Sequence, residues 1–267
     1  MISKVVSVIT VFFLSTPSFS GELRISGKAI QGGLLFGWTT PDSKISLDGM
    51  NIVQAQAGDF LVGFPPNAKA LSVLKIFYTD GSSERRMFFV KKRNYKIQRI
   101  DGLSKRKVTP NLKDLMRIKD ERILINRAYL TAMMEPLFKV GFIQPVIGRI
   151  SGVYGSQRIL NGTARRPHYG VDIAAASGTN IKAVSAGIVV FVHPGMFFNG
   201  KTLVINHGLG LRSTYIHMSA IKVKEGERVS KGQIVGKVGE TGRATGPHLH
   251  WGLRLHSTPL DPEQLFR

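Results

Sequence analysis

Three short segments in the second half of the chain hold side chains that could bind a metal ion. They read His168-Tyr169-Gly170-Val171-Asp172, Tyr215-Ile216-His217-Met218 and Gly246-Pro247-His248-Leu249-His250-Trp251. Imidazole nitrogens and carboxylate oxygens are common ligands of zinc. The chain has no cysteine, so a thiolate site and a disulfide framework are both excluded. Any metal must therefore be held by nitrogen and oxygen atoms.

The local sequence indicates how these side chains are presented. His248 and His250 are two residues apart in a segment of strand character, and alternate residues of a strand point to one face of a sheet. A lone pair of this kind is more typical of a solvated strand, but the other two segments strengthen a shared role. Glycine and β-branched residues disfavour a helix around His168. We expect His168 in a loop and Asp172 on the strand that follows.

Taken together, the three segments resemble the lysostaphin-like M23 metallopeptidase family. The shared pattern is His-x-x-x-Asp, then an isolated histidine, then His-x-His within residues 245–250. The resemblance covers roughly residues 147–260 and leaves the chain before about residue 140 unexplained. It implies an antiparallel sheet of the lysostaphin/LytM type, which is similar to the sheet of lipoyl domains.

Position by position, the resemblance implies that His168, Asp172 and His250 bind Zn²⁺ and that His217 and His248 are catalytic. Three protein ligands leave one tetrahedral position for water, whereas a structural zinc site is closed by a fourth protein ligand. Which of His217 and His248 is the general base stays open. The chain has no His-Glu-x-x-His sequence, so a thermolysin-like arrangement is excluded.

The implied function is zinc-dependent hydrolysis of peptide bonds in bacterial peptidoglycan, in cross-links or stem peptides, during cell-wall remodelling. One alternative is a non-catalytic envelope regulator that activates a cell-wall amidase, but such members usually have substituted ligands. The other is a secreted bacteriolysin, which normally adds a wall-targeting domain that residues 21–99 do not resemble. The bond that is cut stays open, and the loops Arg158–Pro167 and Met196–Gly200 are expected to decide it.

The remaining candidate residues are expected to have structural roles. Trp251 alternates with His250 along the strand and is predicted to lie in the core or the groove floor. Residues 239–246 lack the ending of a phosphate-binding loop and are predicted to form a wall of the substrate groove. Three histidines are predicted to be surface residues rather than ligands: His193, His207 and His256.

The pattern of apolar runs and turn residues divides the chain into parts. Residues 140–267 alternate β-runs with glycine turns, which predicts a compact antiparallel β domain carrying the site. Its strands are expected at 181–192, 202–206, 212–217, 233–238 and 248–255. Turn signals in residues 21–108 predict a small β-sandwich-like accessory domain. The predicted fold class is therefore mainly β.

A helical linker is predicted over residues 109–139. Thr109 is expected to cap the helix, with Pro110 at its first position, and helix is expected to continue towards Met134. Three apolar residues at helical spacing are predicted to pack against the protein: Leu112, Leu115 and Met116.

The first twenty residues have the pattern of a cleaved signal peptide. Lys4 precedes the apolar run Val5–Leu14, and Ser18-Phe19-Ser20 forms a small-x-small cleavage site. A membrane anchor is the alternative, but the run is shorter than the roughly 20 residues that span a bilayer. We therefore expect export to the periplasm or cell envelope, with secretion as a variant of that location.

The chain is strongly basic. It has 37 Lys and Arg against 17 Asp and Glu, a formal net charge of +20. Residues 85–107 hold ten of the basic residues and one acid, Asp101. This segment is predicted to be a solvated surface that contacts anionic envelope polymers or lipid. Nucleic acid is not expected because no nucleic-acid-binding module accompanies the charge. Oligomeric state stays open.

Overall fold

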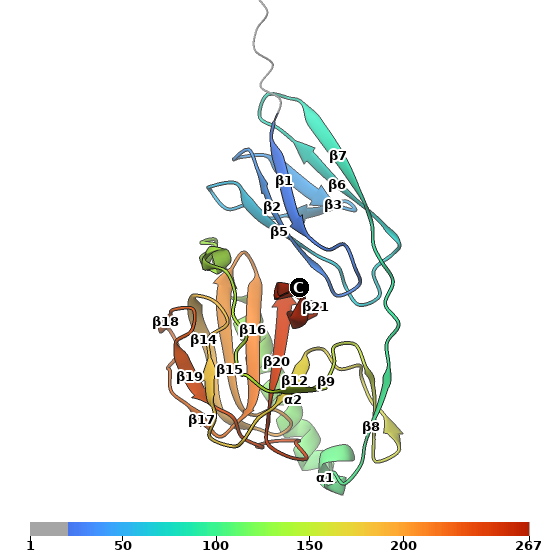
Figure 1. Ribbon diagram of the computed structural model, residues 1–267, viewed down its shortest axis with the longest axis vertical. Coiled ribbons are helices and arrows are strands. Elements are labelled where there is room, and N and C mark those ends of the chain that lie inside the picture. The colour runs from blue at the N-terminus through green and yellow to red at the C-terminus, as the bar shows by residue number, and fades with distance from the viewer. Residues whose placement is uncertain (1–20, 267) are drawn as a thin grey trace, which may run out of the picture.

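The computed structural model in Figure 1 describes residues 21–266, so the expected signal peptide at residues 1–20 lies outside the described residues. Strands dominate, as predicted, and the longest helix lies between two β-rich parts. Figure 1 shows the amino-terminal strands at one end of the molecule and the carboxyl-terminal sheet at the other. Within residues 21–266, no helix is both long and apolar enough to cross a membrane.

The amino-terminal part consists of two antiparallel sheets. One has the order β1-β2-β5, with the bounds Leu23–Gly27, Leu34–Thr39 and Asp59–Gly63. The other has the order β4-β3-β6-β7, with the bounds Met50–Ile52, Lys44–Leu47, Leu71–Phe77 and Ser83–Phe89. Side chains of both sheets share one core, in which Phe60 of β5 and Ile76 of β6 are each 1% exposed. The expected sandwich-like arrangement is confirmed.

One strand from the amino-terminal region joins the carboxyl-terminal part. β8 (Ile97–Ile100) pairs in parallel with β10 (Gln157–Leu160), and β10 pairs antiparallel with β11 (Thr163–Ala164). The range expected for the accessory domain, 21–108, thus supplies a strand next to the predicted site loop. The two parts are joined by main-chain hydrogen bonds as well as by the linker.

Two helices follow, α1 (Lys105–Val108) and α2 (Leu112–Leu130). The predicted cap at Thr109 is wrong, because Thr109 ends α1. Asn111 caps α2, and its side-chain oxygen accepts a hydrogen bond from the Asp114 backbone N–H at 2.9 Å. Asparagine is as good a cap as threonine or better, so composition alone could not choose between them.

The apolar residues of α2 that were predicted to pack are exposed instead. Leu112, Leu115 and Met116 are 76%, 51% and 63% exposed. The buried face of α2 mixes polar and apolar residues, namely Asp114, Glu121, Ile125 and Ala128. The spacing of the apolar residues predicted the wrong buried face, because ion pairs and hydrogen bonds, rather than apolar burial, hold the first half of the helix against the protein.

The carboxyl-terminal part is built on an eight-stranded sheet. Its order is β18-β14-β15-β16-β20-β12-β9, with β21 also paired to β20. In that order the bounds are Arg228–Val229, Gly187–Met196, Gly200–Gly208, Leu211–Met218, His248–Leu255, Val171–Ala174 and Arg149–Gly152, with Thr258–Leu260 for β21. All its pairings are antiparallel, as predicted.

A smaller sheet covers one face of the large sheet. It has the order β13-β19-β17, with the bounds Asn180–Lys182, Ile234–Lys237 and Ala220–Ile221. The strand predicted at 181–192 is therefore split between β13 and β14, because the chain passes from one sheet to the other. The other four predicted strands are confirmed. Short 3-10 helices, η1 (Leu137–Val140) and η2 (Pro262–Leu265), complete the fold.

Candidate metal centre and active site

Neighbouring strands of the large sheet position the candidate residues. Asp172 of β12 lies opposite His250 of β20, and Ile216 of β16 lies on the other side of His250. His168 lies in the loop before β12, as predicted. His217 follows Ile216 and is buried. The sheet thus brings all five predicted residues together from three segments far apart in sequence.

His168, Asp172 and His250 form a compact donor cluster. One ligand atom from each lies within 4.8 Å of the others. His168 Nε2 is 2.7 Å from His250 Nδ1, and Asp172 Oδ1 is 2.8 Å from His250 Nδ1 and 3.1 Å from His168 Nε2. His168 and Asp172 are only 3% and 6% exposed, and His250 is half-buried, so the three donors converge at the edge of the protein interior.

The protonation states of the three donor residues are those that a bound cation requires. Burial opposes ionisation of Asp172, but the neighbouring rings of His168 and His250 outweigh it and hold the carboxyl pKa well below its usual value. Burial lowers the pKa of His250 to about 4. His168 Nδ1 donates to the Val153 carbonyl at 3.1 Å, which leaves Nε2 as an acceptor. A carboxylate and two neutral imidazoles fit Zn²⁺, whose ligands must be deprotonated.

His217 and His248 lie beside the donor cluster with their ring centroids 4.8 Å apart. His217 Nδ1 donates to the Thr241 carbonyl at 2.7 Å, and His248 Nδ1 donates to the Gly246 carbonyl at 2.8 Å. A carbonyl can only accept, so both rings carry hydrogen on Nδ1 and keep Nε2 free. His248 Nε2 lies 3.9 Å from Asp172 Oδ1. Both free nitrogens can therefore serve a substrate at the cluster.

His217 is held in an unusual backbone conformation. Its φ is +64°, in the left-handed region that non-glycine residues rarely adopt, and its N–H donates to the Asn199 carbonyl at 2.8 Å. Burial, followed by the nearby His248 and His250, lowers its pKa to about 3. Backbone strain that is kept by surrounding hydrogen bonds is typical of functional sites.

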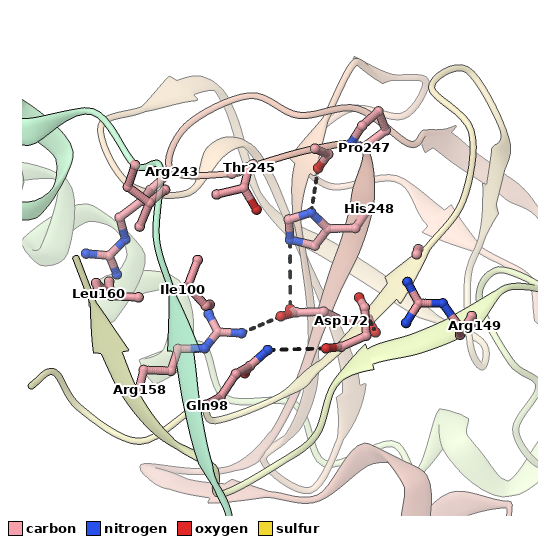
Figure 2. Close-up of a pocket in the computed structure, with 15 residues that line it drawn as sticks. Gln98, Ile100, Arg149, Arg158, Leu160, Asp172, Arg243, Thr245, Pro247 and His248 are labelled. Atoms are coloured by element: carbon pink, nitrogen blue, oxygen red, sulfur yellow. Dashed lines mark hydrogen bonds and ion pairs between the residues drawn. The ribbon is translucent and has the colours of Figure 1, made fainter. Parts of the chain in front are cut away.

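The two carboxylate oxygens of Asp172 have different partners. Oδ1 faces the histidines, whereas Oδ2 forms an ion pair with Arg158, whose side chain is 19% exposed (Figure 2). Gly152 allows this close approach, because a Cβ at that position would lie 2.4 Å from Asp172 Oδ2. Arg158 was foreseen only as the start of a loop, since no motif marks it.

Two hollows open beside the cluster. The larger, of about 660 Å³, reaches His168, His217 and His250. The smaller, of about 280 Å³, is shown in Figure 2 with Asp172 and His248 on its wall. Parts of both predicted loops line the larger hollow. Side chains of α2 and β8 also line the hollows, which no sequence pattern predicted: Leu115, Ile118 and Arg122 from α2, and Gln98 and Ile100 from β8.

The 239–247 loop lines the smaller hollow with residues 243–247, so part of the segment predicted as a groove wall has that place. Gly242 has φ +82°, and a Cβ there would lie 2.4 Å from both Gly200 N and Phe198 O. The Arg243 N–H donates to the Phe198 carbonyl at 2.8 Å. Glycine is required for this approach, which holds the 239–247 loop against the β14–β15 turn.

The three histidines outside the cluster have different environments. His256 is exposed and His193 is half-buried. The surface prediction is wrong for His207, which is fully buried, with Nδ1 2.7 Å from the Ala186 carbonyl and Nε2 2.7 Å from Ser213 Oγ. Its strand β15 lies between β14 and β16 and is covered on both faces. Side chains on both sides of this strand are therefore buried, and their alternation along the strand could not identify His207 as buried. Trp251 is 1% exposed, as predicted.

Comparisons with known proteins bear on this geometry. The model of the family described as Peptidase family M23 matches residues 166–262. A crystal structure of a Pseudomonas aeruginosa protein assigned to peptidase M23 superposes with a TM-score of 0.68 at 30% identity, covering 89% of this chain and 95% of that one.

Two curated relatives match over shorter stretches. Peptidoglycan DD-endopeptidase ShyA of Vibrio cholerae is 40% identical over 116 residues, which are 42% of this chain and 26% of that protein. DD-carboxypeptidase/endopeptidase Mpg of Neisseria meningitidis is 38% identical over 127 residues, 46% of this chain and 29% of that protein. The matched part is less than a third of either relative's length.

Proposed function

This chain belongs to peptidase family M23, and from that premise we propose that it is a zinc-dependent endopeptidase that hydrolyses peptide bonds in bacterial peptidoglycan. The observation that supports this most is the compact cluster of His168, Asp172 and His250 with two further histidines beside it. The names of the curated relatives favour a cross-link between D-amino acids as the bond that is cut.

Zinc would be held by His168 Nε2, Asp172 Oδ1 and His250 Nδ1. These three atoms are two imidazole nitrogens and one anionic oxygen. Three protein ligands would leave the fourth tetrahedral position of a zinc ion to a non-protein ligand. When bound, Zn²⁺ supplies Lewis-acid polarisation and a water nucleophile at neutral pH.

His217 and His248 would move the protons of the reaction. Peptide hydrolysis takes a proton from water and returns one to the leaving amine. Both rings have a fixed tautomer with Nε2 free, so each can accept a proton there and then donate it. In the protonated state, either N–H can also stabilise negative charge on the carbonyl oxygen.

Location and partners follow from this proposal. Peptidoglycan lies in the envelope, so we propose export through the signal peptide at residues 1–20. The exposed basic residues of the 85–107 segment would hold anionic envelope polymers or lipid, but several of its cations already have partners within the protein. Arg93 pairs with Asp261, Arg106 pairs with the buried Asp114, and Lys107 donates to the Phe197 carbonyl. The domain limits 21–108, 109–139 and 140–267 stay proposals.

The regulator and bacteriolysin alternatives are less well supported. Neither is suggested by the names of the curated relatives, which are endopeptidases and carboxypeptidases. A regulator does not need five intact donor and proton-transfer groups, all of which are clustered here.

Digestion of purified peptidoglycan tests the proposal. The zinc-loaded protein would be compared with a chelated sample, with His248→Ala, and with His256→Ala as a matched control at an exposed histidine. We expect fragments from the wild type and His256→Ala only, and mass analysis would identify the bond. A folded, zinc-loaded protein that releases nothing from walls of several types would refute the proposal.

A further inference from the structure

Arginine lines the hollows beside the site to an unusual degree. The residues are Arg122, Arg149, Arg158, Arg165, Arg166 and Arg243. No lysine lines either hollow within residues 21–266, although lysines are frequent elsewhere in the chain. Asp172 is the one acid on these walls in that same range, and it already pairs with Arg158. The walls therefore carry a large excess of positive charge.

Arg243 is held in place by an aromatic ring but has no carboxylate partner among the described residues. In Figure 2, Arg243, Arg158 and Arg149 surround the hollow, with Asp172 and His248 between them. The Arg243 guanidinium carbon lies 4.3 Å from the centre of the Phe198 ring, which fixes its position. Among the described residues, no carboxylate forms an ion pair with Arg243.

The guanidinium groups near Arg243 repel its positive charge as long as no anion lies between them. Burial and the charges of Arg158 and Arg165 lower the pKa of Arg243 to about 10. The Nε atoms of Arg158 and Arg165 are buried and have no hydrogen-bond partner. Like charges held close together in a partly buried groove repel one another, and a bound anion relieves that repulsion.

The use of arginine rather than lysine indicates which kind of anion this groove binds. A guanidinium presents a planar fork of N–H groups that matches the two oxygens of a carboxylate, whereas lysine acts as a point charge. We propose that this groove selects peptides bearing a free carboxylate next to the scissile bond, which Arg243 binds with Arg165 beside it. This rests on the proposed peptidase function and names the substrate class of the same site.

Binding of a stem tetrapeptide with free carboxylates, compared with the same peptide fully amidated, tests the inference. Calorimetry on the zinc-loaded full chain would use the wild type, Arg243→Gln and Arg243→Lys. Arg86→Gln is the matched control, since Arg86 lies exposed on β7 far from the groove in sequence. Circular dichroism would verify that each variant is folded.

We expect the wild type to bind the free acid about 10- to 100-fold more tightly than the amide, the range for a hydrogen-bonded charge. Arg243→Gln should abolish that preference, Arg243→Lys should keep part of it, and Arg86→Gln should keep all of it. Equal binding of acid and amide by the wild type, or an unchanged preference in Arg243→Gln, would overturn the inference.

Cleavage of cross-linked dimers in acid and amide forms separates this inference from the proposed function. Cleavage of both forms at equal rates, with equal binding, would refute carboxylate selection and leave the peptidase intact. Preferential binding that depends on Arg243, without cleavage of any wall material, would refute the peptidase and support carboxylate selection.

Discussion

At the residue scale, Asp172 shows how a proposed metal ligand can be oriented by a group outside the donor cluster. Arg158 takes Oδ2, so Oδ1 is left facing His168 and His250. Partners of this kind fix the orientation of metal ligands, and their loss typically weakens metal binding by about 10- to 100-fold. Arg158 is thus a positioning residue for the proposed zinc site.

Replacement of Arg158 should therefore weaken zinc binding even when no substrate is present. We predict that Arg158→Gln lowers zinc affinity by about 10- to 100-fold and that Arg158→Lys recovers part of it. Competition with a chromophoric chelator would measure both. Arg166→Gln, at an exposed arginine between β11 and β12, is the control and should bind zinc like the wild type. Unchanged affinity in Arg158→Gln would show that Asp172 is oriented without it.

His207 makes stability depend on pH for a reason unrelated to catalysis. Burial lowers its pKa from 6.5 to about 4 in the folded protein. Between these two values the unfolded chain binds a proton that the folded protein does not, so acidification favours unfolding. The stability contributed by the neutral, buried ring is complete above pH 6.5 and falls as the pH drops towards 4.

The prediction is a loss of about 3 kcal/mol in unfolding free energy over that pH range from His207 alone. Urea unfolding of the wild type and His207→Gln at pH 7.5, 5.5 and 4.5 would measure it. Other buried histidines contribute to both proteins, so the difference between the two curves isolates His207. Parallel curves would mean that His207 does not change its protonation on unfolding.

At the element scale, α2 supports the site through polar contacts. Glu121 is 7% exposed, and its Oε2 accepts a hydrogen bond from Phe197 N at 2.7 Å while Oε1 pairs with Arg117. Two residues further on, the Asn199 carbonyl accepts the N–H of His217. The helix therefore fixes the turn between β14 and β15, and that turn fixes a proposed catalytic histidine.

Loss of the Glu121 carboxylate should loosen this turn. We predict that Glu121→Ala costs about 1–3 kcal/mol, because the buried Phe197 N–H loses its partner. It should also lower kcat/KM several-fold while the zinc content stays unchanged. Glu121→Gln retains an acceptor oxygen and should keep most of the activity, and Asp120→Ala removes an exposed acid from the same helix as a control. Full activity in Glu121→Ala would show that the turn holds its shape alone.

Features of the strands and helices that depend on neighbouring residues could be predicted from the sequence. His250 could be placed beside His248 because strand alternation is local, and glycine turns marked most strands of the large sheet. The buried face of α2 could not be found, because Glu121 is buried by a hydrogen bond to Phe197, 76 positions away. The parallel pairing of β8 with β10 likewise has no local signal, since it joins segments that are distant in sequence. Backbone carbonyls that orient the histidines are equally invisible in a sequence.

At the scale of the whole molecule, the two β-rich parts share an apolar cluster. Leu34 and Leu61 come from the amino-terminal sheet, and Leu253, Leu255 and Leu260 come from the carboxyl-terminal part. All are less than 9% exposed. Burial of this surface stabilises both parts together, because separation would expose it to water.

Ion pairs close the same junction. Arg93 Nη2 lies 2.6 Å from Asp261 Oδ2, and the Asp261 side chain is 2% exposed. Lys139 Nζ lies 3.0 Å from Asp59 Oδ2 across the same boundary. The Asp261 N–H also donates to the Gly32 carbonyl at 2.8 Å. With the β8–β10 pairing, these contacts indicate that the two parts unfold as one unit.

Leu61→Ala tests this cooperativity, because it truncates a side chain in one part and can be detected in the other. The change leaves a cavity in the shared cluster and should cost about 2–5 kcal/mol. The chain has two tryptophans, Trp38 on β2 and Trp251 on β20, so a Trp38→Phe background reports only the carboxyl-terminal part. We predict that Leu61→Ala lowers the urea midpoint of Trp251 fluorescence together with the midpoint of far-UV circular dichroism. Met87→Ala is the control, because Met87 on β7 is 58% exposed, and it should leave both midpoints unchanged. An unshifted Trp251 transition beside an earlier loss of β-structure would mean that the two parts unfold separately despite the shared cluster.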